Sequence, residues 1–314
     1  MAENTVKKIA TRESYGNSLK ELAEEFPNLV VLDADLAAAT KTGIFRKAYP
    51  DRHIDCGIAE ENMMGVAAGL SLVGKIPFVS SFAMFAAGRA FEQVRNSIGY
   101  PHLNVKIGAT HAGITVGEDG ATHQCNEDIA LMRTIPGMVV MCPSDDVEAR
   151  AAVRAALEYE GPVYIRFGRA AVPVINDHPG YHFEIGKGTV VREGKDVTIV
   201  ATGICVDSAL GAAKMLEEEG ISAEVVNICT IKPLDEDIIL NSAKKTGKVV
   251  TVEEHSVIGG LGSAVCDCLC AHYPVPVKKV GMQDVFGESG SAAALVEKYG
   301  LDAKGVYKSV KEFL

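Results

Sequence analysis

The sequence predicts an α/β protein built from two doubly wound domains. Short runs rich in β-branched residues alternate with longer segments of helical periodicity, and this alternation occurs twice along the 314 residues. The predicted strands are continuously apolar, as strands are in parallel sheets that helices cover on both faces. Between the two series, residues 170–188 contain two prolines and three glycines without helical periodicity. We therefore expect a first domain at 1–172, a linker at 173–188 and a smaller second domain at 189–314.

The first domain is predicted to contain five strands and five helices in alternation. The strands are expected at 28–33, 75–81, 103–109, 137–142 and 162–167. The helices are expected at 13–26, 60–72, 84–97, 128–134 and 145–159. The last helix follows Pro143-Ser144-Asp145-Asp146, which supplies an N-cap and early negative charge. A mostly parallel sheet of this kind places its ligands at the carboxyl ends of the strands.

The second domain repeats the alternation without repeating the sequence. Its strands are expected at 196–202, 223–228, 248–254 and 275–281. Its helices are expected in a segment ending near Glu219, at 235–245 and at 261–272. The three cysteines of the last helix alternate along the chain, so they do not share one helix face, and we interpret them as packing residues.

Composition excludes several classes of function. A net charge of −10 disfavours a nucleic-acid partner, although a few local arginines would suffice for a small phosphorylated substrate. The sequence contains no run of about eighteen apolar residues, so no membrane span is predicted. The N-terminus lacks the apolar core of a secretory signal. The eight cysteines show no zinc-type C-x-x-C spacing. We expect a cytoplasmic protein with reduced thiols.

The strongest local signal is the glycine-rich segment 106–124, which follows a predicted strand. It carries His111, Glu118, Asp119 and His123 beside three glycines that permit tight bends. Histidines and carboxylates together suit general acid–base chemistry near neutral pH. The alternative is a flexible surface loop with solvated side chains. The spacing matches no zinc motif, so no metal site is predicted.

Three further signals each allow two interpretations. Glu60 and Glu61 begin an apolar helix, where they either complement the helix dipole or place a buried carboxylate that needs a hydrogen-bonding partner. Phe82 and Phe85 either line a pocket for a planar ligand or anchor the helix in the core, and the core is favoured.

Arginines form the third signal. Arg12 begins a helix, and Arg166 and Arg169 flank Phe167 at a strand end. They suit a phosphate or carboxylate ligand, and surface salt bridges are equally plausible.

Taken together, these segments resemble the C-terminal half of transketolase, of the type encoded as two separate chains. The resemblance covers nearly the whole length. It rests on IATRESYG (9–16), VLDADLAAAT (31–40), DCGIAEEN (55–62), SFAMF (81–85), THAGITVGEDGATHQ (110–124), TIVATG (198–203) and VEEHSVIGGLG (252–262). It implies a pyrimidine-binding domain of the thiamin diphosphate enzymes, followed by a transketolase C-terminal domain.

The resemblance also implies roles for individual residues. Glu60 matches the glutamate that hydrogen-bonds the cofactor's aminopyrimidine and so promotes removal of the C2 proton. Phe82 and Phe85 match aromatic residues that pack on the pyrimidine ring. Further cofactor contacts are implied for Asp35, Leu36 and Ile58. Catalytic roles are implied for Glu60, His111 and His123, and substrate contacts for Arg12, His111, Asp119, His123 and Arg166.

Departures from the family pattern matter for substrate and partner. Ala39 stands where a phosphate-contacting serine is usual, Ala121 replaces a proline, and Gly88 lies where many relatives carry an aromatic residue. The chain also has no G-D-G motif, with which these enzymes hold the diphosphate and its divalent cation. We therefore expect an N-terminal subunit to bind the diphosphate and Mg²⁺, in a two-plus-two heterotetramer.

The implied function is transfer of a two-carbon ketol unit from a ketose phosphate to an aldose phosphate, as in the pentose phosphate pathway. One alternative is another family member, either a 1-deoxyxylulose-5-phosphate synthase fragment or a 2-oxo acid dehydrogenase β subunit. The GEDG loop with its THQ favours transketolase over the dehydrogenase subunits. A non-catalytic assembly subunit is the third possibility, and Glu60, His111, Asp119 and His123 argue against it.

Overall fold

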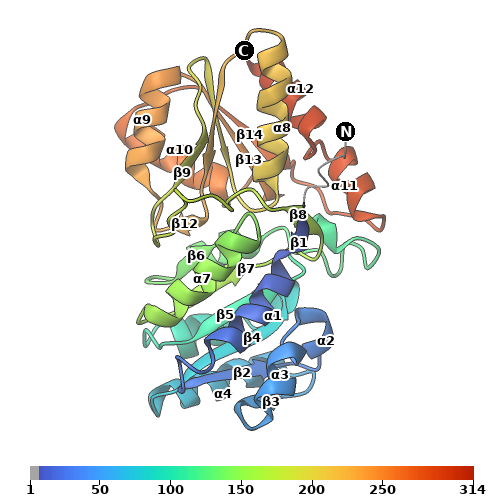
Figure 1. Ribbon diagram of the computed structural model, residues 1–314, viewed down its shortest axis with the longest axis vertical. Coiled ribbons are helices and arrows are strands. Elements are labelled where there is room, and N and C mark those ends of the chain that lie inside the picture. Colours follow the sequence, from blue (N-terminus) through green and yellow to red (C-terminus); the bar gives the residue numbers. More distant parts are fainter. Residues whose placement is uncertain (1–6) are drawn as a thin grey trace.

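Two sheets, one above the other in Figure 1, organise the computed structural model, which describes residues 7–314. The lower, seven-stranded sheet has the order β12 (Thr230–Lys232), β6 (Val139–Met141), β7 (Val163–Arg166), β5 (Lys106–Thr110), β4 (Ile76–Phe82), β2 (Leu29–Asp33) and β3 (His53–Asp55). All of its pairings are parallel except that of β12 with β6. The predicted α/β class and mostly parallel sheet are confirmed.

Helices cover both faces of the lower sheet. On one face α1 (Thr11–Leu22) packs against α7 (Asp146–Glu158), over a core that includes Tyr15, Phe78 and Phe167. On the other face lie α4 (Glu60–Leu72), α6 (Asp128–Arg133) and the segment 84–99. Two short helices, α2 (Ala37–Thr40) and α3 (Gly43–Ala48), follow β2. The apolar strands are thus buried on both sides, which is why they lack polar alternation.

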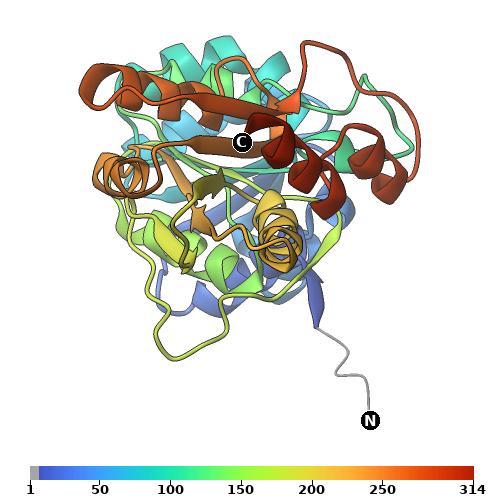
Figure 2. The ribbon, with the colours of Figure 1, turned by 90° about the horizontal axis from the view of Figure 1, so that it is seen from above.

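The upper sheet has five strands, in the order β14 (Val277–Met282), β13 (Val249–Ser256), β10 (Val197–Ala201), β11 (Ala223–Asn227) and β9 (Thr189–Arg192). Helices α8 (Cys205–Glu218) and α12 (Ala303–Phe313) pack together on one side, and α9 (Glu236–Thr246) and α10 (Leu261–His272) on the other (Figures 1 and 2). A short α11 (Ala292–Lys298) packs against residues 114–116 of the lower domain.

The two domains share structure across their boundary. Strand β12 comes from the second half of the chain but pairs with β6 of the lower sheet. One continuous buried cluster contains residues of both halves, among them Met63, Ile129, Ile231 and Leu261. Residues 173–188 contain no helix, and β8 (Ala171–Pro173) pairs with β1 (Lys8–Ala10) beside them. The domain boundaries themselves stay a prediction.

Most predicted elements are found within a few residues of their expected ends. Helices Glu60–Leu72 and Leu261–His272 have the predicted bounds. The single helix expected at 84–97 is wrong in detail, because two π-helical segments, Met84–Arg89 and Val94–Gly99, flank the short α5 (Phe91–Gln93). Such segments are often found at functional sites. Over residues 7–314, no helix combines the length and apolarity needed to cross a membrane.

Candidate functional site

The candidate residues converge because they follow neighbouring parallel strands. Leu36 comes after β2, Ile58 after β3, Phe82 ends β4, His111 comes after β5 and Arg169 after β7. These strands are neighbours in the lower sheet. Their carboxyl ends therefore meet at one sheet edge, where open α/β sheets bind ligands.

Glu60 is a buried carboxylate with two hydrogen-bond donors. It begins α4 and is 1% exposed, whereas its neighbour Glu61 is exposed. Ser81 Oγ donates to Glu60 Oε1 at 3.1 Å, and Arg89 Nη1 donates to Oε2 at 2.8 Å. The Arg89 guanidinium also lies 4.4 Å from the centre of the Phe85 ring. Both oxygens of this buried carboxylate therefore have a hydrogen-bonding partner, as a buried polar group requires.

The aromatic residues form a stack beside Glu60. The rings of Phe82 and Phe85 lie 5.8 Å apart at an angle of 12°, and the His111 ring stacks on Phe82 at 3.9 Å. His123 meets Phe85 edge-on at 5.4 Å. Phe82 is buried, which fits a core anchor, whereas Phe85 is partly exposed and lines a cleft. The position of Phe82 therefore agrees with the core interpretation, and that of Phe85 with the pocket interpretation.

His111 is a neutral imidazole with a defined tautomer. Arg12 Nη1 lies 3.2 Å from Nε2, and a guanidinium can only donate, so Nε2 accepts. Nδ1 then carries the proton and donates to Thr110 Oγ1 at 2.9 Å. Burial, followed by the nearby positive charges of Arg12 and Arg169, lowers the pKa of His111 to about 3. At neutral pH this side chain offers hydrogen bonds without a charge.

The structure corrects the expected role of Arg166. Its side chain is 5% exposed, and its Nε donates to both carboxylate oxygens of Asp128. Its Nη2 donates to the carbonyl oxygens of Cys125 and Glu254, at 3.3 and 2.8 Å. These partners hold the guanidinium inside the protein, so it is not placed to receive a substrate phosphate.

Arg169, the other arginine that flanks Phe167, lies nearer the surface. It is 40% exposed and bonds Val116 O and Glu118 Oε2. Burial is the main cause that lowers the pKa of Arg12 and of His111, and the charge of Arg169 lowers both further. Arg12 itself donates to Ala39 O at 2.8 Å. Arg12 and Arg169 therefore give His111 a positively charged environment.

The remaining predicted residues lie at the open rim. The Asp33 carboxylate shapes the segment after β2 by accepting from Leu36 N, at 2.5 Å, and from Thr40 and Thr42. Asp35 in this segment and Asp119 are exposed, and Ile58 is 76% exposed. The rim therefore presents side chains that a ligand or another subunit can cover.

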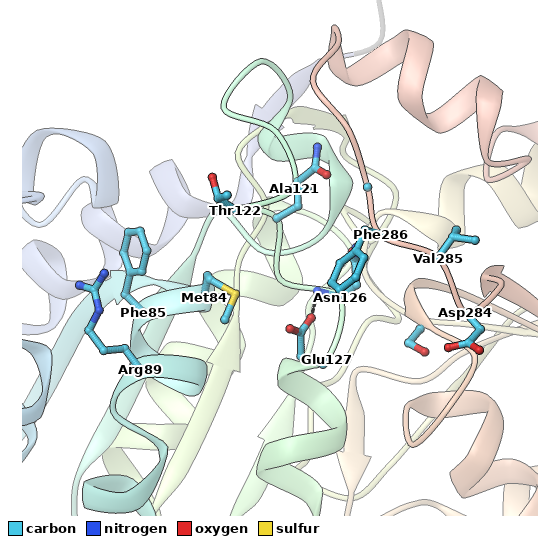
Figure 3. A pocket seen from close by; sticks show the side chains of 13 residues that line it. Met84, Phe85, Arg89, Ala121, Thr122, Asn126, Glu127, Asp284, Val285 and Phe286 are labelled. Atoms are coloured by element: carbon cyan, nitrogen blue, oxygen red, sulfur yellow. Dashed lines mark hydrogen bonds between the residues drawn. The ribbon is translucent and has the colours of Figure 1, made fainter.

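A cleft of about 630 Å³ opens next to these residues, between the two domains. Phe85 and Arg89 form one wall, and Val285 and Phe286, from the loop after β14, form the other (Figure 3). The Phe286 side chain is 88% exposed. Sequence analysis missed this wall, because an aromatic residue in a loop carries no periodic signal. Among the described residues, no group of three or more His, Cys, Asp or Glu could hold a metal ion.

The fold and the convergent residues define a two-domain α/β protein with a candidate ligand site at a sheet edge. The chain belongs to the transketolase family. The family model for the transketolase pyrimidine-binding domain matches residues 7–174, and the model for the transketolase C-terminal domain matches residues 186–306. The resemblance recognised in the sequence is therefore confirmed.

Several similar proteins are named as parts of split transketolases. A "Putative transketolase C-terminal section" from Methanocaldococcus jannaschii is 51% identical, over 96% of this chain and 95% of the relative. A 6-deoxy-6-sulfo-D-fructose transketolase subunit from Clostridium sp. is 49% identical, over 96% and 93%. A solved "Split gene transketolase, inactive beta4 tetramer" is 58% identical, covers 98% of both chains and superposes with a TM-score of 0.89.

Proposed function

We propose that this chain is the C-terminal subunit of a thiamin diphosphate-dependent transketolase, which transfers a two-carbon ketol unit from a ketose phosphate to an aldose phosphate. The observation that carries the proposal is one sheet edge that joins the buried Glu60 carboxylate, an aromatic stack and a basic group around neutral His111. Bound thiamin diphosphate supplies an electron sink for cleavage of a carbon–carbon bond next to a carbonyl group.

The residues present fit the pyrimidine half of this cofactor. Phe85 offers an aromatic face at the cleft, and Glu60 offers a paired, buried carboxylate next to it. In our proposal Glu60 accepts a hydrogen bond from the pyrimidine ring and Phe85 packs against that ring. Leu36 and Ile58 cover its edges, with Asp35 beside them. These are contacts of this chain alone and leave the diphosphate to be held elsewhere.

The sugar side of the site is assigned to the loop after β5. Neutral His111 accepts a hydrogen bond from a substrate hydroxyl at Nε2, the nitrogen that faces Arg12, and Asp119 binds a further hydroxyl. His123, whose ring lies against Phe85, moves a proton on or off a substrate oxygen. Arg12 and Arg169 bind the phosphate by charge-assisted hydrogen bonds. Ala39 presents no hydroxyl to that phosphate.

A partner subunit is part of the proposal. The rim residues Asp35 and Ile58 are exposed, the sequence has no G-D-G, and the relatives are named as sections or subunits. We propose an N-terminal subunit that binds the diphosphate and Mg²⁺, in a two-plus-two cytoplasmic assembly. The relative described as an inactive β4 tetramer supports the expectation that this subunit alone does not turn over.

Reconstitution tests the function directly. We expect the purified chain alone to show no ketol transfer, and the chain mixed with an N-terminal subunit, thiamin diphosphate and Mg²⁺ to convert phosphorylated ketose and aldose. Full activity of the lone chain would contradict the half-enzyme proposal. A stable complex that turns over no donor would favour the non-catalytic alternative, and pyruvate as the only donor would favour the synthase or dehydrogenase alternative.

The anionic group of the donor needs its own comparison. One relative acts, by its name, on a 6-deoxy-6-sulfo sugar, and Ala39 removes a hydroxyl donor next to Arg12. A ketose phosphate and a 6-sulfo ketose should therefore be assayed side by side in the same complex. A higher kcat/KM for the ketose phosphate supports our proposal. A higher kcat/KM for the 6-sulfo ketose would identify the sulfonated sugar as the donor instead.

A further inference from the structure

We propose that Glu254, a residue of the second domain, is a positioning residue for the substrate loop 111–126, and that fixing this loop is what the second domain contributes to the reaction. The inference deepens the proposed function and rests on it for the identity of the substrate. The placement of the loop against the second domain rests on the structure alone.

The substrate loop contains little regular secondary structure. Between β5 and α6 it contains one short helical turn, Ile114–Val116. His111 has a φ of 55°, and Gly113, Gly117 and Gly120 also have positive φ. Backbone in these conformations persists only where surrounding contacts determine it. Hydrogen bonds within the loop, such as that from Gly113 N to Cys125 O at 2.9 Å, supply part of this support, and contacts from the second domain add to it.

Glu254 supplies the central contact. It lies near the end of β13, is 3% exposed, and accepts a hydrogen bond from Thr115 N at 2.7 Å. A Cβ added to Gly113 would lie 2.3 Å from Cδ of Glu254, so the carboxyl group rests directly on the loop backbone. The carboxylate thereby fixes the turn that follows His111.

Arg166 connects Glu254 to the far end of the loop, at Cys125. Its Nη2 donates to the carbonyl oxygens of Glu254 and of Cys125, the latter two residues after His123. Its Nη1 lies 3.9 Å from Glu254 Oε2. Burial raises the pKa of Glu254, and the adjacent guanidinium opposes that rise. The buried arginine thus joins the loop to the second domain.

A second set of contacts holds the outside of the loop. Gln124 Nε2 donates to Glu288 O at 2.8 Å and to Ile114 O at 3.2 Å, and Ser289 Oγ donates to Glu118 O at 2.6 Å. The loop therefore lies between Arg12 of the first domain, which contacts His111, and two segments of the second domain. A shift of about 1 Å in His111 or His123 is enough to cost about 100-fold in rate.

The neighbouring Glu253 provides a matched control. It lies on the same strand, is fully buried and is also a carboxylate, but it accepts from Leu261 N and Gly262 N at the start of α10 and not from the loop. Removing its side chain should destabilise the second domain without releasing the substrate loop. Comparing E254A with E253A therefore separates positioning from general stability.

Hydrogen exchange of the full chain is the first test. E254A should raise exchange of the peptide 111–118 at least about tenfold, because the Thr115 amide loses its buried acceptor. E253A should raise exchange at 259–264 and leave 111–118 unchanged. E254Q keeps an oxygen acceptor and should restore protection of 111–118. Unchanged exchange of that peptide in E254A, or equal exchange in both alanine variants, would overturn the inference.

Kinetics of the reconstituted complex are the second test. E254A should lower kcat by about 30- to 100-fold at unchanged thiamin diphosphate affinity, since Glu60, Phe82 and Phe85 lie on the first domain. E254Q should recover kcat to within about threefold, and E253A should keep it. Wild-type kcat in E254A would refute the positioning role. An inactive wild-type complex would instead refute the proposed function, while the exchange result would still decide the loop contact.

Discussion

Glu60→Gln tests the assignment of the cofactor's pyrimidine to this chain. Glutamine keeps the shape of the side chain, and its oxygen can still accept from Ser81 Oγ. Its amide group, however, faces the Arg89 guanidinium, so donor meets donor where a 2.8 Å charged hydrogen bond existed. Such bonds contribute about 1.5–3 kcal/mol, and Arg89 is 43% exposed, so water replaces part of the loss. We expect the free energy of unfolding to fall by about 1 kcal/mol.

The catalytic loss should be far larger than the loss in stability. A missing proton-transfer contact costs about 10²- to 10⁴-fold, so kcat of the Glu60→Gln complex should fall at least about 100-fold while assembly is intact. Urea unfolding, size-exclusion chromatography and a coupled assay of ketol transfer measure the three quantities. Glu61→Gln, one residue along the helix and exposed, should match wild type in all of them. A Glu60→Gln complex with kcat within tenfold of wild type would remove Glu60 from the cofactor site.

Four further predictions follow from the contacts described above and from one pKa shift. His111 binds a proton below about pH 6.5 in the unfolded chain, but only near pH 3 in the folded protein. Lowering the pH from 6.5 to 5 should therefore reduce the free energy of unfolding by about 2 kcal/mol through this residue. Urea unfolding at the two pH values should show this loss in the wild type and not in His111→Asn. Arg169→Ala should raise KM for a phosphorylated donor about 10- to 100-fold with stability within about 1 kcal/mol. Arg166→Ala should instead destabilise the fold by about 3–5 kcal/mol, because the buried carboxylates of Asp128 and Glu254 lose their partner. Equal effects of the two arginine variants on the free energy of unfolding would contradict these assignments. Gly113→Ala should lower the free energy of unfolding by about 1–3 kcal/mol, because φ at Gly113 is 74° and the added Cβ would clash with Glu254. An unchanged melting temperature would show that the loop can move away from Glu254.

Local patterns predicted the longer helices as far as α10, but not the short α2 and α3 or the C-terminal α11 and α12. They also failed where long-range contacts decide the structure. The helix Glu60–Leu72 has its predicted bounds because its signal lies within the segment itself. Arg166 and Arg169 look equivalent in sequence, three residues apart at a strand end. Contacts with Asp128 and Glu254, both distant in the sequence, hold Arg166 inside the protein, whereas Arg169 is 40% exposed.

The cleft wall shows the same limit. Phe286 lies in a loop without periodicity, and its position opposite Phe85 depends on how the two domains pack. The π-helical segment Met84–Arg89 has the composition of an ordinary helix, so residue preferences alone could not distinguish the two geometries. A Cβ at Gly88 would lie 2.3 Å from Cε of Met84, the flexible end of that side chain, so Met84 would have to move.

Strand β12 makes the two halves of this chain mutually dependent for folding. It covers the outer edge of β6, and buried residues of both halves form one cluster. A fragment ending near residue 188 would expose β6 as an open, apolar edge, which invites aggregation. Limited proteolysis or gene truncation inside 173–188 should therefore yield insoluble pieces rather than two working modules, and the chain should melt in a single cooperative transition.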